Sequence, residues 1–386
     1  MSKEVLALRT ASVSESATLA LNAEAKRLEA EGRTIYNLTA GELNTNTPDY
    51  IQKAVAEKLH LNKYTPVAGL TELRLKIASE VRNFYGLDWI TSDNVVVTAG
   101  AKPALYVTLL AIINPGDEVI VPTPAWVSYQ HMIELVGGKV IEVPLSDGFE
   151  LDLRAIQAHI TKRTKAIVIN SPHNPTGAIF SKAALKDLAT TLKGSSITVI
   201  ADDIYAKLVY DSSFTPTPSV GFEKIVIING YSKSQALTGW RIGYLIADQH
   251  TAQAATSMLS HIMGNAAFPS QQAALAALAR KDKPPTKTLQ SLYNQRQLVN
   301  QVLSKIPGLK VHLPGGAFYF FLDLRTLTSN SIGWCEQLLS ETGVALVPGE
   351  AFSAPGFARL SFVVDKTSLG KALELLAEFV KSGHIK

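Results

Sequence analysis

Residues 229–244, NGYSKSQALTGWRIGY, carry the most informative pattern in the chain. The β-branched run at 225–228 leads into them and predicts a buried β-strand. Lys233 therefore lies just beyond a buried strand, where poor hydration disfavours the ammonium form and lowers the pKa of the amine. A free amine is what Schiff-base chemistry requires, while Ser232 and Arg241 offer a hydroxyl donor and a forked cation that suit a phosphate. Taken alone, the same residues also fit an ordinary surface lysine and a helix arginine.

The composition indicates a globular protein with enough apolar residues for a large core. Of the 386 residues, 46% are hydrophobic, and a chain of this length predicts about two domains. Charged residues make up only 18%, below the roughly 25% of typical soluble domains, so we expect an oligomer that hides part of its surface. The net charge of +4 is small and no dense basic cluster is present, so binding to nucleic acid is not expected.

The cysteine content and the first residues bear on the protein's location. Cys335 is the only cysteine, which rules out an internal disulfide and CxxC metal sites, and we expect no metal. Residues 1–16 lack the apolar segment of a signal peptide, and no apolar run approaches the roughly 20 residues that span a bilayer. We therefore expect a cytoplasmic protein with no membrane partner.

From about residue 94 onward, apolar strand-like runs alternate with helical segments. Runs that are apolar throughout are typical of strands buried on both faces of a parallel or mostly parallel α/β sheet. Six such strands are expected, in NVVVTAG, EVIVPTP, KVIEVPL, AIVINSP, TVIADDIY and KIVIINGY. The C-terminal part, from about residue 305, predicts a smaller α+β unit. Helices outside the alternating region are expected at 14–31, at 49–61, from Thr71 to just before Gly86, and near 331–342.

Chemically useful side chains follow the expected strands, at the ends where ligands bind in open α/β sheets. Gly100-Ala101 lies between a strand and a helix, where free backbone N–H groups favour an anion, although the GxGxxG fingerprint is absent. Trp126 offers a ring for stacking, and Asp202, which follows an apolar run, needs a cationic partner. Together with their neighbours they supply what an aromatic phosphate cofactor carrying an aldehyde needs: Gly100, Ala101, Lys102, Trp126, Asn174, Asp202, Tyr205, Ser232 and Lys233.

Asn174 and one further candidate, Arg359, each have a plainer alternative. Asn174, in SPHNPTG, can donate to a phenolate oxygen, but Asn-Pro and Gly also form a turn by themselves. Arg359 lies within the apolar segment FARLSFVVD, and a buried arginine normally pairs with a carboxylate, which a substrate can provide.

The chain resembles the fold-type-I pyridoxal-phosphate enzymes, specifically the class I aminotransferases, over nearly its whole length. The segment from Gly230 to Gly243 fits the family's lysine-attachment signature, and SPHNPTG and DDIY occur at the right intervals. The resemblance implies a large domain, 48–290, with a mostly parallel mixed sheet flanked by helices. It also implies a small α+β domain made of 1–47 and 291–386, and a homodimer with shared active sites.

The resemblance also implies a role for each candidate residue. Lys233 would attach pyridoxal 5′-phosphate covalently and shuttle a proton, Asp202 would pair with the pyridine nitrogen, and Tyr205 would hold the ring's 3-oxygen with Asn174. Trp126 would stack on the ring. The phosphate would be held by Gly100, Ala101, Ser232 and Arg241, and by Tyr64 from a second subunit, and Lys102 would also contact the cofactor. The substrate α-carboxylate would be bound by Arg359, assisted by Gly41, Asn174 and Trp126.

Within the family, the chain is most similar to bacterial aspartate aminotransferases, a subgroup that includes dual aspartate/prephenate enzymes. SATLALNAEAK, TAGAKPALY and PAWVSY carry this likeness, and Thr18 and Lys102 would then bind the substrate's distal carboxylate. We expect amino transfer between L-aspartate and 2-oxoglutarate by a ping-pong mechanism. The alternatives are a prephenate, aromatic or broad-specificity aminotransferase, a C–S lyase of the family, a regulatory module that binds the cofactor, and a binding protein without it. Departures from the family pattern are Asp203, Ala125 and His173.

Overall fold

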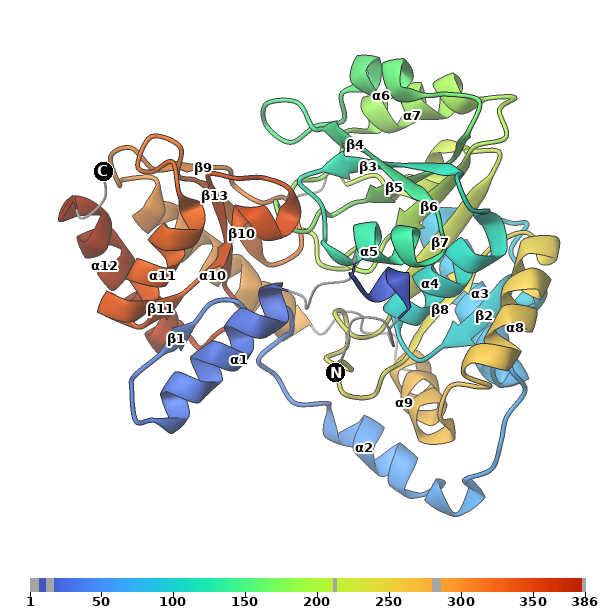
Figure 1. Cartoon of the computed structure of the whole chain (residues 1–386). Coiled ribbons are helices and arrows are strands. Elements are labelled where there is room, and N and C mark those ends of the chain that lie inside the picture. The colour runs from blue at the N-terminus through green and yellow to red at the C-terminus, as the bar shows by residue number, and fades with distance from the viewer. Residues whose placement is uncertain (1–6, 12–16, 211–213, 280–285, 384–386) are drawn as a thin grey trace.

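The computed structural model describes residues 7–11, 17–210, 214–279 and 286–383 (Figure 1). Within them, seven strands form a central sheet in the order β2-β8-β7-β6-β5-β3-β4. All neighbours are parallel except β8, which is antiparallel to both β2 and β7. The strands are β2 (Val95–Thr98), β3 (Glu118–Thr123), β4 (Lys139–Pro144), β5 (Thr164–Asn170), β6 (Thr198–Asp202), β7 (Ile225–Gly230) and β8 (Gly243–Ile246). The expected mostly parallel mixed sheet is confirmed.

The strand β8 is the member of this sheet that the sequence did not indicate. Like β2 it is only four residues long, but it begins with a glycine and follows a turn directly, without a helix between it and β7, so the alternation of strands and helices did not indicate it. Its direction matters for the site. Because β8 runs antiparallel to its neighbours, the residues that precede it lie at the edge where the other strands end.

Both faces of the central sheet are covered by helices, as apolar strands require. Alternate side chains enter separate cores, with Val96 on one face and Val95 and Val97 on the other. One face packs against α4 (Ala101–Ile112), α5 (Ser128–Leu135) and α8 (Gln249–Ile262). The opposite face packs against α2 (Asp49–Ala56), α3 (Thr71–Tyr85), α6 (Leu153–His159), α7 (Lys182–Leu192) and α9 (Phe268–Ala279).

A second group of elements lies beside this layer (Figure 1). Its antiparallel sheet has the order β12-β13-β10-β9, and β1 (Tyr36–Asn37) pairs in parallel with β11 (Val344–Ala345). We propose that this group is the small domain of 1–47 and 291–386, with 48–290 forming the large domain and residue 290 inside α10. The remaining elements are β9 (Lys310–Val311), β10 (Tyr319–Asp323), β12 (Val347–Pro348), β13 (Phe357–Ser361), α1 (Ala17–Ala30), α10 (Thr286–Leu303), α11 (Ser331–Thr342) and α12 (Lys366–Lys381).

The expected helices are present with one correction, and residues 14–16 of the first, expected at 14–31, lie outside the described residues. The helix predicted from Thr71 ends before Gly86, whose left-handed conformation (φ +70°) terminates it, and the helix at 331–342 is α11. The helix predicted at 49–61 is wrong in its second half, because α2 ends at Ala56 and a separate 3₁₀ turn, η3, covers Leu59–Leu61.

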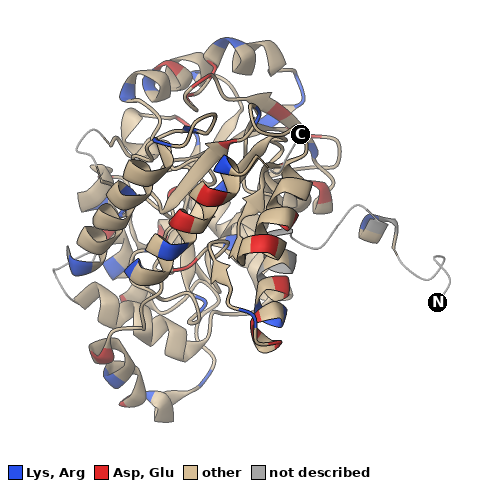
Figure 2. Ribbon diagram, turned by 90° about the vertical axis from the view of Figure 1, so that its left-hand side faces the viewer, with Lys and Arg blue, Asp and Glu red and all other residues tan. Residues whose placement is uncertain are grey.

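The surface carries both signs of charge. Figure 2 shows Lys and Arg interspersed with Asp and Glu along the helices, as the small net charge indicates. None of the helices in the described ranges is long and apolar enough to cross a bilayer.

Candidate active site

Most of the expected site residues meet in one cavity of about 210 Å³ at the carboxyl edge of the central sheet. This is the position at which open α/β sheets bind ligands. Side chains from both groups of elements line it: Gly41, Ala101, Lys102, Trp126, Tyr129, Asn170, Asn174, Asp202, Ile204, Tyr205, Ser232, Lys233, Thr238, Arg241, Tyr319 and Arg359.

Lys233 follows β7, and its amine contacts the loop that follows β1. Its Nζ donates a hydrogen bond to the carbonyl oxygen of Gly41. Burial lowers the pKa of Lys233 to about 8, with the positive charges of Arg241 and Arg359 adding to the effect and Glu42 opposing it. The amine is therefore available as a nucleophile close to neutral pH, as expected from its place after a buried strand.

Asp202 is the last residue of β6 and lines the same cavity. Its Oδ2 accepts a hydrogen bond from the Tyr129 hydroxyl at 2.6 Å, and its Oδ1 accepts one from the backbone N–H of Ile204 at 3.3 Å. Burial nevertheless raises the pKa of Asp202, because these donors and the distant Lys233 only partly offset the loss of water. A cation brought to this carboxylate would stabilise its ionised form, and a protonated pyridine nitrogen is such a cation.

The opposite end of the cavity suits a phosphate. Helix α4 begins at Ala101 with no side-chain cap, so its first backbone N–H groups have no intrahelical partner. Arg241 lies against this loop, since a Cβ added at Gly100 would be 2.6 Å from its guanidinium. Gly243 fits equally closely, because a Cβ there would be 2.5 Å from the backbone nitrogen of Ala101. Ser232 and Thr238 add hydroxyl groups to the lining.

Arg359, on β13, is fully enclosed, with a side chain only 2% exposed in total. One of its terminal nitrogens donates to Oδ1 of Asn174 at 3.0 Å, and the other donates to the carbonyl oxygen of Thr39 at 2.9 Å. Its Nε has no partner, and no carboxylate of the described residues forms an ion pair with it. Burial accordingly lowers the pKa of Arg359. An enclosed cation that lacks a counterion calls for an anionic ligand.

Trp126 and Lys102 line the same cavity from neighbouring loops. The indole ring of Trp126 contacts Tyr129 edge to face, with 5.3 Å between ring centroids, and leaves a face toward the cavity lining. The Lys102 ammonium lies 4.9 Å from the Trp126 ring centroid. Partial burial and the charge of Arg241 lower the pKa of Lys102. A second anionic group of a ligand would stabilise the ammonium form of this lysine.

Tyr205 and Asn174 take up defined positions in the lining. The Tyr205 hydroxyl lies 2.9 Å from that of Tyr319. Asn174 is held by its backbone N–H, which donates to Oδ1 of Asn170 at 2.8 Å. Sequence reasoning missed Tyr129, Asn170, Thr238 and Tyr319. For the tyrosines a signal existed, because a tyrosine in an apolar stretch needs a partner for its hydroxyl.

Two expected residues, Gly100 and Tyr64, are not among those that line this cavity. Tyr64 is 98% exposed and lies away from the lining of its own subunit. Thr18 lies in α1, but its side chain falls outside the described residues. The three departures from the family pattern, Asp203, Ala125 and His173, are buried and do not line the cavity. The neutral His173 ring, whose pKa burial lowers to about 3, bonds instead to Thr176.

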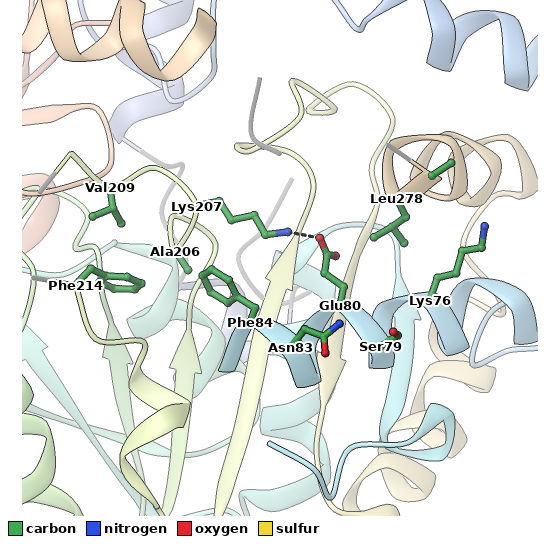
Figure 3. A pocket seen from close by; sticks show the side chains of 11 residues that line it. Lys76, Ser79, Glu80, Asn83, Phe84, Ala206, Lys207, Val209, Phe214 and Leu278 are labelled. Atoms are coloured by element: carbon green, nitrogen blue, oxygen red, sulfur yellow. Dashed lines mark hydrogen bonds and ion pairs between the residues drawn. The ribbon is translucent and has the colours of Figure 1, made fainter. Parts of the chain in front are cut away.

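A larger hollow of about 820 Å³ lies elsewhere, between α3, α9 and the segment after Tyr205 (Figure 3). Its two lysines already have partners within the chain. Lys207 is 2.6 Å from Glu80, the pair drawn in Figure 3, and Lys76 is 3.5 Å from Glu72. The smaller cavity is the better candidate, because it holds the charged groups whose partners are missing.

Comparison with known proteins agrees with this geometry. A family model described as aminotransferase class I and II matches residues 33–376. An aspartate aminotransferase of Thermotoga maritima is 40% identical over 97% of this chain and 99% of its own. An aspartate/prephenate aminotransferase of Thermus thermophilus is 38% identical over 96% and 98%. The solved structure of a Thermus thermophilus aspartate aminotransferase with maleate superposes with a TM-score of 0.91, at 36% identity over 97% and 99% of the two chains.

Proposed function

The chain belongs to the class I and II aminotransferases and is a transaminase, and on this basis we propose that it moves an amino group reversibly between L-aspartate and 2-oxoglutarate. The observation that carries the proposal is the enclosed Arg359, which has no ion-pair partner among the described residues. Its planar fork suits a substrate α-carboxylate, bound through two parallel hydrogen bonds. Asn174 and the Thr39 carbonyl hold the fork in place, and Gly41 lies at the same wall of the cavity.

The family implies pyridoxal 5′-phosphate, and the residues present fit it. Asp202 is a buried carboxylate in need of a cation, Lys233 has an amine of lowered pKa, and the α4 N-terminus with Arg241 forms an anion cradle. Tyr205 and Asn174 are available for the 3-oxygen, and Trp126 for the ring face. When bound, this cofactor supplies an electron sink for the bond cleaved at the substrate Cα.

The chain's own groups perform the remaining tasks. The Lys233 amine would take the proton from the substrate Cα as a general base and, once protonated, would act as the general acid, because its pKa near 8 suits both directions. Ionised Asp202, fixed by Tyr129, keeps the ring nitrogen protonated. Arg359 orients the substrate so that its Cα faces Lys233.

Preference for a dicarboxylate is the finer part of the proposal. Lys102 places its ammonium in the lining beside Trp126, apart from Arg359 on β13, and we assign it to the distal carboxylate. Thr18 is proposed for the same task. A relative named for both aspartate and prephenate supports prephenate as the second candidate, since prephenate also carries two carboxylates.

We also propose a homodimer in the cytoplasm. Leu59, Leu61 and Ile262 are about half exposed, and a second copy of the chain would cover such apolar side chains. Tyr64 is presented outward on a loop that the buried Gln271 fixes by bonding to the N–H of Leu70 and the hydroxyl of Thr65. A rigid, exposed tyrosine of this kind suits the phosphate of a partner's site.

Steady-state rates with single amino acids test the proposal. Arg359→Leu should lower kcat/KM for every amino donor about thirtyfold to several-thousandfold, since losing one partner of a buried charge pair costs roughly 2–5 kcal/mol. Lys102→Ala should lower kcat/KM for aspartate but not for alanine or phenylalanine. Arg325→Leu is the control, because Arg325 is exposed in the turn that follows β10 and is paired with Asp323. A wild-type enzyme that prefers phenylalanine or alanine to aspartate would contradict the assignment.

A further inference from the structure

Tyr319 contacts both Arg359, the proposed substrate-binding residue, and Tyr205, the proposed partner of the cofactor's 3-oxygen. It lies on β10 and is 1% exposed, yet it lines the cavity. Strand β10 pairs with β13, where Phe321 faces Arg359 and Tyr319 faces Ser361. Tyr319 is therefore the diagonal neighbour of Arg359 across the two strands, which is within reach of an aromatic side chain.

The ring of Tyr319 supports the substrate-binding arginine. The Arg359 guanidinium carbon lies 4.4 Å from the Tyr319 ring centroid and 4.9 Å from that of Phe352. A cation on an aromatic face is held without using up its N–H donors, so all of those directed at a ligand stay free. The ring thus fixes the plane of the guanidinium.

The hydroxyl of Tyr319 contacts Tyr205, the residue proposed to hold the cofactor's 3-oxygen. It lies 2.9 Å from the Tyr205 hydroxyl, and Tyr205 is its hydrogen-bond partner among the described residues. A phenol has one proton to donate. If Tyr205 directs its proton into the cavity, toward an anionic ring oxygen, then Tyr319 is the donor between the two hydroxyls.

We propose that Tyr319 is a positioning residue for both the cofactor and the substrate. Its hydroxyl donates to Tyr205, and its ring holds Arg359. The donated bond polarises Tyr205 and strengthens the bond that Tyr205 gives to the 3-oxygen. This inference rests on the proposed function, because it takes the cofactor's 3-oxygen as the acceptor of Tyr205.

Tyr319→Phe tests the hydroxyl while keeping the ring. Without the bond from Tyr319, Tyr205 would donate a weaker hydrogen bond to the 3-oxygen. That oxygen would then better stabilise the proton on the nitrogen that would join the cofactor to Lys233. The pH midpoint of the bound cofactor's absorbance change should therefore rise by about 0.3 to 1 unit, the size of one neutral hydrogen bond. The turnover number kcat should fall, with KM for aspartate nearly unchanged. Tyr210→Phe is the matched control, since Tyr210 is a neighbouring tyrosine that bonds to the backbone of Ala317 and does not line the cavity.

A double substitution shows whether the hydroxyl acts through Tyr205. In a Tyr205→Phe background, Tyr319→Phe should move the midpoint no further. An unchanged midpoint in the single variant, or an equal shift in both backgrounds, would overturn the role of the hydroxyl. Tyr319→Leu tests the ring, and KM for aspartate should be about fivefold higher than in Tyr319→Phe; equal values would overturn it. A wild-type protein without cofactor absorbance would instead refute the proposed function.

Discussion

At the scale of single residues, the site is defined by charges that the chain itself leaves unbalanced. Asp202 and Arg359 are both buried, and neither has an opposite charge within ion-pairing distance among the described residues. Buried charges without a partner lower the stability of the fold, and a ligand of opposite charge offsets this cost when it binds. Lys233 lies among these charges, and its amine responds to all of them.

The amine of Lys233 should react at a pH far below that of an ordinary lysine. Burial disfavours its ammonium form, so the pKa moves down to about 8. At pH 7.5 roughly a quarter of the amine is then unprotonated, against about 0.1% for a lysine with the usual pKa near 10.4. Labelling of the cofactor-free protein with an amine-directed reagent, followed by mass spectrometry of the Lys233 peptide, should be half-maximal near pH 8. A short peptide with one lysine is the control, and a common midpoint near 10.4 would contradict the prediction.

At the scale of elements, the phosphate cradle depends on close contact between the start of α4 and the start of β8. Gly100 and Gly243 face each other across this contact, and a Cβ on Gly243 would lie 2.5 Å from backbone atoms of Gly100 and Ala101. Backbone cannot rotate away as a flexible side chain can. A side chain added at Gly243 would therefore force either α4 or β8 to move.

Gly243→Ala should therefore weaken cofactor binding at least about tenfold and lower the melting temperature, since overpacking costs about 1–3 kcal/mol. The control is Gly239→Ala in the same loop, where an added Cβ meets nothing within 4 Å. Titration of the cofactor-free variants with pyridoxal phosphate, together with thermal melting, measures both effects. Equal affinities for the two variants would show that the contact does not hold the cradle.

The central sheet was predictable because each long apolar run follows directly from burial on both faces. The strand β8 was not, since it starts with a glycine directly after a turn and is not separated from β7 by a helix. The sequence indicated that Arg241 suits a phosphate because it is a forked cation near Lys233, but the reason it lies beside the start of α4, the reversed direction of β8, needed the structure. Tyr129 and Tyr319 escaped notice because their function depends on partners, Asp202 and Tyr205, that are far away in the chain.

At the scale of the whole molecule, a single chain supplies most of the residues of the candidate site, but its Tyr64 does not line that site. Its side chain is almost fully exposed, while its loop is fixed by Gln271. The segment η2 (Leu8–Ala11) also lies well apart from the rest of the fold (Figure 2). A second subunit would make use of both features, and an isologous dimer would exchange Tyr64 between two equivalent sites.

Hybrid dimers can decide whether Tyr64 serves the partner. Tyr64→Ala homodimers should lose at least about tenfold in kcat/KM, as expected for one hydrogen bond to a charged group, and Lys233→Ala homodimers nearly all activity. A hybrid of the two variants, co-expressed with different affinity tags and purified through both, contains one site with Lys233 from one chain and Tyr64 from the other. Such a hybrid should show about half the wild-type activity per dimer. If Tyr64 acts within its own subunit, no intact site forms, and the hybrid stays at the mean of the two homodimers.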